Sequence, residues 1–377
     1  MLLPPTTASP NDSQIGRRCL MNKTMLTLAA EVLPTPVKNA IKRYPPFCDL
    51  RRILIRRQEY WQRVLRGRHL SIELTTRCNL NCRYCPRDVM LKTRKIGDMN
   101  PSLFRRIVDQ AAALNLEVVS EVGYGEPLMH PDFLESIRYL RQKMPSVEIL
   151  LSTNGTLLSE EVAHEIVKFD VDQIVLSLNL ASREKYKAIN GADKYDQVVQ
   201  NVKNFLSILN RDGTKRRTHA YLQIMKELHT QSEIDEFRRL WSPLMSPNAE
   251  IFVKSLTDWA GLVDLGWVGL SEPSSENMFE PERYPCTSIY GRVITIDGRV
   301  LACCLALPIM PQELIIGDAR VQDLEEIMDN DRIRHLKKLN VNEGLETIYP
   351  CSNCNRWKDR PNLFARNRIP LLKRKWF

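Results

Sequence analysis

Between residues 69 and 254 the chain alternates short apolar runs with amphipathic stretches. The apolar runs predict six strands, at residues 69–74, 117–123, 147–152, 173–178, 219–224 and 250–254. Apolar residues spaced three or four apart predict the intervening helices, at residues 101–114, 133–144, 159–169, 195–209 and 232–244. Regular alternation of strand and helix is typical of a parallel sheet with right-handed crossovers, so the chain belongs to the α/β class.

Six such units predict an open, partial (β/α)6 barrel related to the TIM barrel. Parallel strands of a barrel bring the residues that follow their C-terminal ends to one edge, where the chemistry of these folds takes place. Three motifs fall at that edge: a cysteine-rich loop after the first strand, Gly125-Glu126-Pro127 after the second, and Thr153-Asn154-Gly155 after the third. We therefore expect the functional site there.

Composition narrows the class of protein. With 377 residues, 43% hydrophobic and 26% charged, the chain suits a globular protein of two or three domains. No apolar run is long enough to cross a bilayer, and the N-terminus lacks the pattern of a secretory signal. Of ten cysteines, all but Cys19, Cys48 and Cys304 lie in tight motifs. Motif cysteines in an unsecreted chain indicate metal binding in a reducing cytoplasm.

The net charge of +9 is unevenly placed, because residues 1–69 carry 13 Lys/Arg against 4 Asp/Glu and residues 356–377 carry 8 against 1. The stretch between is therefore net acidic. We expect residues 1–25 to be disordered, residues 26–68 to form a basic helical extension and residues 359–377 a basic tail. Basic ends can contact an anionic substrate, a membrane surface or a partner, or can fold back on the acidic body or stay solvated.

The loop at residues 75–86 reads TTRCNLNCRYCP and places Cys78, Cys82 and Cys85 in a C-x3-C-x2-C pattern. Iron–sulfur clusters are usually held by four cysteine thiolates, so three leave one iron open to another ligand. Zinc sites combine cysteine pairs, and no fourth Cys or His follows nearby, although a zinc site or a buried cysteine cluster remains an alternative. The loop resembles the signature of radical S-adenosylmethionine (SAM) enzymes.

That resemblance implies a [4Fe-4S] cluster whose open iron binds SAM, which is reductively cleaved to a 5′-deoxyadenosyl radical. It also implies a cofactor pocket in which Tyr84 packs near the adenine and Gly125-Glu126-Pro127 receives the SAM amino group. Four polar residues match family positions that contact the SAM carboxylate or ribose: Ser152, Asn154, Ser177 and Asn179. The family often has Asp where this chain has Asn179, so a carboxylate is missing there.

A second cysteine set follows residue 285. Residues 292–301 predict a hairpin with an Asp297-Gly298 turn, and residues 321–339 predict a helix. Around them lie four cysteines that could hold one closed cluster, or a zinc ion on spacing alone: Cys286, Cys303, Cys351 and Cys354. The arrangement resembles the twitch/SPASM domain in its form with one auxiliary [4Fe-4S] cluster. We expect a barrel at 69–256, a linker at 257–285 and this domain at 286–358.

Cys304 is the unassigned cysteine of the second set. It could replace Cys303 as a ligand, serve as a small buried residue, or donate a hydrogen atom to a substrate radical. Candidate substrate contacts after the sixth strand are Lys254, Asp258 and Trp259, of which Trp259 could instead be packing. Glu73 and Glu121 could act on a substrate or simply belong to the barrel.

The resemblance implies that the protein oxidises or otherwise modifies a small polar molecule, such as a sugar, aminocyclitol or natural-product intermediate. Maturation of a ribosomally made peptide is the first alternative. A non-enzymatic iron–sulfur electron carrier is the second. The enzymatic functions need an external reductant such as flavodoxin or ferredoxin, and the basic ends would suit an anionic substrate.

Overall fold

The computed structural model describes residues 68–121, 123–179, 182–211, 216–268, 286–342, 344–345 and 347–354. All of them belong to one compact unit, Trp61–Phe377. The predicted disordered segment, the helical extension up to residue 67 and the basic tail lie outside the described residues, as does most of the predicted linker. No helix in the described ranges is long and apolar enough to span a membrane.

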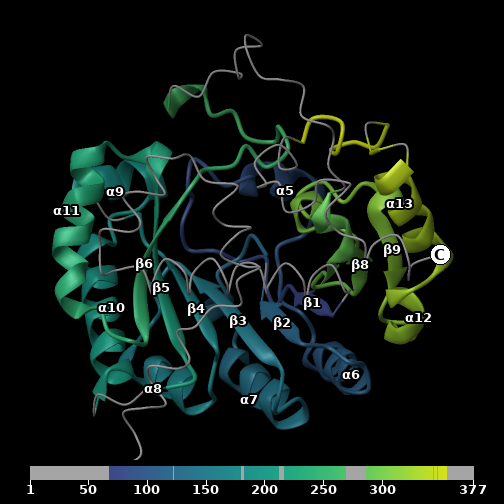
Figure 1. Ribbon diagram of the computed structural model, residues 1–377, viewed down its shortest axis with the longest axis horizontal. Helices are drawn as coiled ribbons and strands as arrows, with labels where there is room; N and C mark the ends of the chain where they lie inside the picture. Colours follow the sequence, from purple (N-terminus) through teal and green to yellow (C-terminus); the bar gives the residue numbers. More distant parts are fainter. Residues whose placement is uncertain are drawn as a thin grey trace, which may run out of the picture. The chain divides into compact units, whose positions relative to one another are not determined.

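A single nine-stranded sheet organises the described chain, in the order β6-β5-β4-β3-β2-β1-β7-β8-β9 (Figure 1). Six parallel strands follow one another in sequence order: β1 His69–Ile72, β2 Val118–Glu121, β3 Glu148–Thr153, β4 Gln173–Ser177, β5 His219–Met225 and β6 Ala249–Lys254. This is the predicted partial barrel, and each predicted strand is present. Three further strands extend the sheet beyond β1: β7 Arg292–Ile294, β8 Arg299–Leu301 and β9 Ile315–Asp318.

Helices connect the parallel strands: α5 Arg87–Thr93, α6 Pro101–Ala112, α7 Phe133–Lys143, α8 Glu160–Lys168, α9 Arg183–Asn190, α10 Tyr195–Leu209 and α11 Gln231–Trp241. Figure 1 shows α6, α7, α8, α10 and α11 along the outer side of the sheet. Side chains of Asn100, Ser159 and Thr230 accept hydrogen bonds from the first-turn backbone of α6, α8 and α11. These caps satisfy N–H groups that a helix start leaves unpaired, and so fix where each helix begins.

Short 3-10 helices complete the described secondary structure: η1 Pro127–Met129, η3 Lys226–Leu228, η4 Ser242–Leu244, η5 Gly266–Val268, η6 Thr287–Tyr290, η7 Cys304–Ala306 and η8 Gln312–Leu314. Two of them begin directly at motif residues. Glu126 caps η1, and Cys303 precedes η7.

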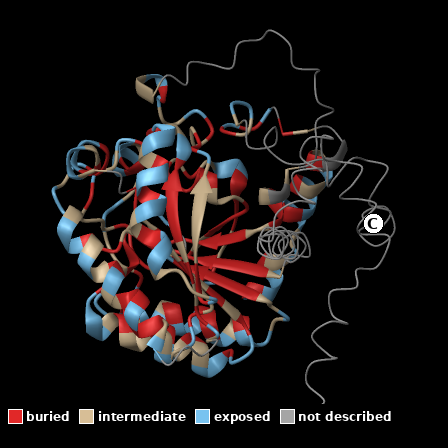
Figure 2. Ribbon diagram, turned by 60° about the vertical axis from the view of Figure 1, so that its left-hand side comes forward, coloured by how far each residue is buried: buried red, intermediate tan, exposed pale blue. Residues whose placement is uncertain are grey.

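The two faces of the barrel strands differ in burial. On β3, Ile149 and Leu151 are buried against the helices, whereas Ser152 between Leu151 and Thr153 is exposed. Figure 2 shows most of the strands buried and the helices exposed on their outward sides. Because strand side chains alternate in direction, the odd positions of β3 build the core and the even positions face the inside of the barrel. The polar inner face is therefore left for a ligand.

The predicted helix at 321–339 is wrong as a single helix. The chain forms α12 Leu324–Met328 and α13 Asp331–Asn342, with a break at residues 329–330. Asn330 causes the break, because its side-chain oxygen accepts from the backbone N–H of Ile333 and its amide donates to the Ile316 carbonyl. An Asn engaged in this way starts a new helix rather than continuing the old one. Helices α5 and α9 and strand β9 were not predicted at all.

The C-terminal hairpin joins the barrel sheet. Strand β7 pairs in parallel with β1, and the Glu73 N–H donates to the Ile294 carbonyl at 2.8 Å. Its turn places Gly298 at a φ of +85°, a conformation that favours glycine. The second cysteine set is thus attached to the same sheet as the first cysteine loop.

Candidate functional site

The first cysteine loop is held by backbone hydrogen bonds to the segment after α5. The Thr76 N–H donates to the Gly97 carbonyl at 2.9 Å, and the Met99 N–H donates to the Leu74 carbonyl at 2.8 Å. The Arg77 guanidinium binds Asp98, with Nε to Oδ1 at 3.0 Å. These bonds fix the entry of the loop, so the cysteines do not depend on a metal alone for their position.

Cys78, Cys82 and Cys85 are all partly buried in this loop. Burial, and then the neighbouring Cys85 and Cys78, raise the pKa of Cys82. Burial raises the pKa of Cys85 to about 12. Thiolates gathered in this way are unstable without a compensating cation, and bound iron is such a cation. The chemistry of the three donors therefore fits an iron–sulfur cluster.

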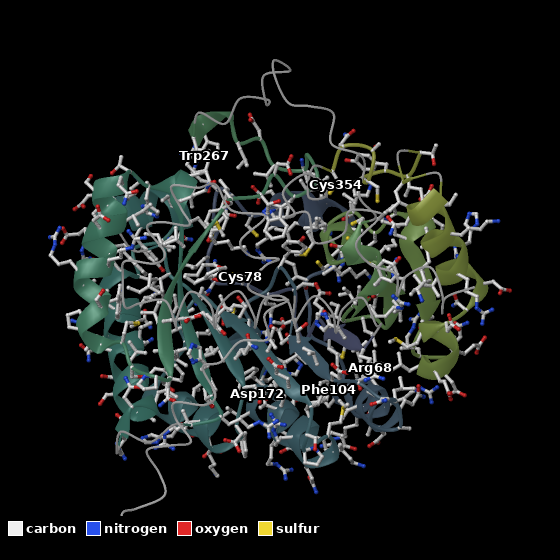
Figure 3. All side chains as sticks on the ribbon, in the orientation of Figure 1. Arg68, Cys78, Phe104, Asp172, Trp267 and Cys354 are labelled. Atoms are coloured by element: carbon white, nitrogen blue, oxygen red, sulfur yellow. The ribbon has the colours of Figure 1, made fainter. Side chains whose placement is uncertain are left out.

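Within the described residues, no three Cys, His, Asp or Glu side chains are arranged to hold a metal ion. The ligand assignments for both cysteine sets therefore rest on position in the fold and on mutual electrostatics. Figure 3 labels one member of each set, Cys78 at the strand ends of the barrel and Cys354 on the side of α13.

Gly125 lies directly against the cysteine loop. A Cβ at this position would come within 2.2 Å of the Thr75 carbonyl oxygen and 2.7 Å of the Arg77 carbonyl oxygen. The next residue, Glu126, donates its N–H to the Arg77 carbonyl at 2.6 Å. Only glycine permits this approach, so the glycine of the Gly-Glu-Pro element sets the spacing between the second strand end and the cysteines.

The Glu126 carboxylate is buried and accepts hydrogen bonds from this chain. Oε1 accepts from the Thr153 hydroxyl at 2.6 Å, and Oε2 accepts from the Asn154 N–H at 2.7 Å. Burial raises the pKa of Glu126 to about 7, against the opposing effect of these hydrogen bonds. The carboxylate thus holds the loop after β3 next to the Gly-Glu-Pro element, and Pro127 begins η1.

Asn154 continues this connection to the cysteine loop. Its side-chain amide donates to the Asn79 Oδ1 at 3.0 Å and lies 4.0 Å from the Cys78 Sγ. Asn79 in turn donates to the Thr156 hydroxyl at 2.8 Å. The predicted pocket residue Asn154 therefore lies beside a predicted cluster ligand, as the motif positions require.

Ser152 and Ser177 lie next to each other, with their hydroxyl oxygens 3.5 Å apart. Gln223 on β5 adds its side-chain amide at 3.5 Å from the Ser177 hydroxyl, a neighbour that the sequence analysis missed. Its signal was available, because Gln223 is a polar residue between the apolar Leu222 and Ile224 of a predicted strand. These three side chains form a polar row on the inner face of the barrel.

Asn179 differs from the prediction, which placed its side chain on SAM. It is fully buried, its amide donates to the Tyr84 hydroxyl at 2.9 Å, and its Oδ1 accepts from the Met225 N–H at 2.9 Å. Its φ of +49° is in the left-handed region. Asn179 therefore positions Tyr84, the aromatic of the cysteine loop, rather than presenting an open amide to a ligand.

The second cysteine set gathers around the end of the hairpin. A hydrogen bond with Cys304, burial and the nearby Cys286 and Cys351 raise the pKa of Cys303 well above its ordinary value. Asn340 on α13 fixes Cys286 through two backbone contacts, at 2.8 and 3.0 Å. Cys286, Cys303 and Cys351 of the predicted ligand set are therefore close enough to affect the ionisation of Cys303.

Cys354 is connected to this set through a turn, in which its N–H donates to the Cys351 carbonyl at 3.2 Å. Cys304 lies next to Cys303 and is not separated from the ligand set. Both cysteines therefore stay candidates for ligation, and hydrogen donation by Cys304 stays a prediction.

Tyr124 and Trp259 lie between the two sets. The Tyr124 hydroxyl donates to the Cys304 carbonyl at 3.4 Å, and burial followed by Cys304, Cys85 and other acidic neighbours raises its pKa. The two rings meet edge to face with centroids 5.3 Å apart, and the Trp259 indole donates to the Tyr84 carbonyl at 2.8 Å. Trp259 is therefore packing between the sets, as one of its two predicted roles required.

The remaining candidate residues are two glutamates of the barrel and two residues that follow or end the sixth strand. Glu73 forms a buried ion pair with Arg94, and Glu121 lies in register with Ile72 on the core-facing side of the sheet. Both placements favour the alternative that they belong to the barrel. Asp258 accepts from the Ala260 N–H at 3.1 Å, whereas Lys254 ends β6 and is only partly buried.

Comparison with known proteins agrees with this geometry. The radical SAM superfamily pattern matches residues 72–220, and the SPASM pattern, described as an iron-sulfur cluster-binding domain, matches residues 286–355. The chain therefore contains a radical SAM domain followed by a SPASM-type iron–sulfur domain. Its fold is a radical SAM barrel followed by a SPASM-type region, and the cofactors of these two regions are a SAM-binding [4Fe-4S] cluster and an auxiliary iron–sulfur cluster.

Curated relatives match different lengths of this radical SAM chain. A probable GTP 3′,8-cyclase of Pyrococcus abyssi is 39% identical over 36% of the chain, and that match spans 42% of the cyclase. The chain thus spans less than half the length of that relative. An S-adenosyl-L-methionine-dependent 2-deoxy-scyllo-inosamine dehydrogenase of Niallia circulans is 26% identical over 76% of the chain and 92% of that enzyme.

Solved structures confirm the fold. The structure of BtrN in complex with AdoMet and 2-DOIA aligns with a TM-score of 0.50 and 19% identity, over 76% of this chain and 92% of that one. The structure of Streptococcus suis SuiB bound to the precursor peptide SuiA aligns with a TM-score of 0.55 and 17% identity, over 72% and 66%.

Proposed function

We propose that this radical SAM protein reductively cleaves SAM and removes hydrogen from a C–H bond of a small polar metabolite, oxidising it. The observation that carries the proposal is the match to the inosamine dehydrogenase, which extends over 76% of this chain and 92% of that enzyme. A sugar, an aminocyclitol or a natural-product intermediate is the substrate class that fits. The match to the GTP cyclase covers 36% of this chain and 42% of the cyclase, so it supports only the shared cofactor chemistry.

Different residues of the chain bind the cofactor and position the substrate. When bound, the cluster and SAM supply a 5′-deoxyadenosyl radical, and the protein supplies binding and orientation. Cys78, Cys82 and Cys85 would hold the cluster, and the 125–127 element and Asn154, which contact the cysteine loop, would bind SAM. Holding a substrate carbon in the adjoining space makes hydrogen removal effectively unimolecular.

Substrate recognition is proposed for the polar inner face of the barrel. Ser152, Ser177 and Gln223 offer hydroxyl and amide groups at the strand ends, and these suit a polyhydroxylated molecule. Lys254 at the end of β6 adds a cation that suits an anionic substituent. An apolar substrate would leave these groups unpaired.

The test of the function is anaerobic incubation with SAM and dithionite, with and without a panel of aminocyclitols and sugars. The expected result is 5′-deoxyadenosine in all reduced samples, and a product two mass units lighter than the true substrate. Protein with an intact cluster that yields no 5′-deoxyadenosine would be an electron carrier instead.

The second cluster is tested by iron analysis of the wild type and of one cysteine variant. Cys351→Ala is expected to lose about half of the bound iron, because a closed cluster needs its full thiolate set. Zinc analysis of the same samples tests for a structural zinc ion, and Mössbauer spectra give the number and kind of iron clusters. Retention of all iron by Cys351→Ala would exclude the proposed auxiliary ligands.

Peptide maturation is the second candidate, supported by the mycofactocin maturase MftC of Mycobacterium tuberculosis, which is 29% identical over 46% of this chain and 41% of its own length. The match covers less of both chains than that to the dehydrogenase, so we rank it second. The same assay with precursor peptides separates the two, because a maturase leaves the small molecules unchanged and alters the mass of a peptide.

The proposed cellular location and reductant follow from the cofactor. A cytoplasmic reductant such as flavodoxin or ferredoxin would deliver the electron, and a reducing cytoplasm suits cysteines that lie in metal-binding motifs. We also propose the domain limits of 69–256 for the barrel and 286–358 for the auxiliary region. Contact of the basic ends with an anionic membrane would show as salt-sensitive liposome binding.

A further inference from the structure

Helix α9 is attached directly to the first cysteine loop. The Asn81 N–H donates to the Asn190 carbonyl at 3.1 Å, and the Arg83 N–H donates to the Ile189 carbonyl at 2.9 Å. The Cys82 thiol lies 3.2 Å from the Asn190 Oδ1. Gly191, at a φ of +73°, ends the helix so close to the loop that a Cβ would come within 2.8 Å of the Asn81 carbonyl. The last turn of α9 is thus one wall of the cysteine site.

Tyr186 lies one turn before Asn190 on the same face of α9. Residues four apart on a helix are neighbours, and here the Asn190 amide donates to the Tyr186 carbonyl at 3.1 Å. The Tyr186 side chain is 1% exposed. Its ring packs edge to face against Tyr195, with centroids 6.2 Å apart. The ring is therefore fixed, and its hydroxyl is directed by this packing.

The Tyr186 hydroxyl is buried and has no hydrogen-bond partner among the described residues. Buried hydroxyls are almost always paired, so an unpaired one indicates a group that belongs at the site. Burial, and then Cys82, Cys78 and Glu126, raise the pKa of Tyr186, so the hydroxyl keeps its proton and can donate. Asn190, on the same face of α9, lies 3.2 Å from the Cys82 thiol, so the cysteine sulfurs are acceptors on the side of the helix that carries Tyr186.

We propose that the Tyr186 hydroxyl donates a hydrogen bond to the iron–sulfur cluster held by Cys78, Cys82 and Cys85, at a ligand or bridging sulfur. Tyr186 is then a positioning residue that adjusts the reduction potential of the cluster. Hydrogen bonds to the sulfurs stabilise the reduced cluster, because reduction adds negative charge to them. The inference rests on the proposed function, which requires this cluster.

The decisive experiment is a redox titration, followed by electron paramagnetic resonance, of wild type, Tyr186→Phe and the control Tyr195→Phe. The cluster of interest is identified as the reduced signal that changes when SAM is added. Loss of the hydrogen bond is expected to make reduction about tenfold less favourable, a potential lower by about 59 mV for one electron. Tyr195→Phe, which changes the neighbouring ring in the same way, is expected to leave the potential unchanged.

Unfolding of the metal-free protein gives a second readout. Tyr186→Phe removes a hydroxyl that is unpaired without the cluster, so the melting temperature of metal-free protein should stay equal or rise. A fall would show that the hydroxyl has a protein partner and would overturn the inference. An unchanged potential in Tyr186→Phe would also overturn it while leaving the function intact. A wild type with no SAM-sensitive signal would overturn both.

Discussion

Replacement of Glu126 by Gln tests two properties of the buried carboxylate. One is its contribution to stability through accepted hydrogen bonds, and the other is its raised pKa. Glu126 is 2% exposed and accepts from the Thr153 hydroxyl at 2.6 Å, the Asn154 N–H at 2.7 Å and the Leu128 N–H at 3.3 Å. An amide has the same shape, but one oxygen is replaced by a group that only donates. At least one of the three donors then loses its acceptor, which lowers the free energy of unfolding by about 1–3 kcal/mol.

The pH dependence of this difference follows from the pKa of Glu126, which burial raises from 4.5 to about 7. The folded protein keeps the proton where the unfolded chain has lost it. The resulting stabilisation is complete below pH 4.5 and disappears as the pH rises to 7. Over this interval of about 2.5 units, at about 1.36 kcal/mol per unit, wild type should lose about 3 kcal/mol relative to Glu126→Gln.

Urea unfolding of both proteins between pH 5 and pH 8 measures the effect. The buried imidazoles His69 and His229, whose pKa values burial lowers to about 4, titrate in the same range. They are present in both proteins, so their contribution cancels in the difference. A difference between wild type and Glu126→Gln that is constant with pH would refute the reasoning, because the hydrogen bonds would then have outweighed the desolvation of the carboxylate.

Two further substitutions test the support of the cysteine loop. Gly125→Ala places a Cβ within 2.2 Å of a backbone oxygen, so this variant should lose most of its bound iron. The control Gly97→Ala, whose Cβ has its nearest atom at 3.7 Å, should keep its iron. Iron analysis of both variants measures the difference. Arg94→Ala leaves the buried Glu73 carboxylate without its partner and should lower the free energy of unfolding by about 3–5 kcal/mol in urea unfolding. Removing the exposed Arg138 from its ion pair should change it by less than about 1 kcal/mol, and equal effects would contradict the burial argument.

The sequence predicted the parts of the site that depend on the spacing of apolar residues and on short motifs. Alternating strands and helices fixed the order of the parallel strands, so the residues after β1, β2 and β3 had to meet at one edge. That is why Cys78, Gly125 and Asn154 lie together as predicted. The helix starts at Asn100 and Ser159 were also readable, since capping is a local interaction between neighbouring residues.

Features that depend on contacts between distant segments were not predicted. Helix α9 is short, and only Tyr186, Ile189 and Asn190 of it are buried, so its apolar pattern is incomplete. Asn179 was read as a cofactor contact because of its position after a strand. Its actual partner, Tyr84, is 95 residues away, and no local pattern records such a bond.

The pairing of β7 with β1 explains how two cysteine sets far apart in the sequence are held at a fixed separation. Glu73 at the end of β1 accepts from the Ile296 N–H of the hairpin at 3.3 Å and also binds Arg94, which follows the helix of the first cysteine loop. The first set is thus connected through α5 and the second through the hairpin to one buried carboxylate. The Tyr124 and Trp259 rings meet edge to face, and their polar groups donate to the Cys304 and Tyr84 carbonyls, so this aromatic pair adds a second connection between the two cysteine regions.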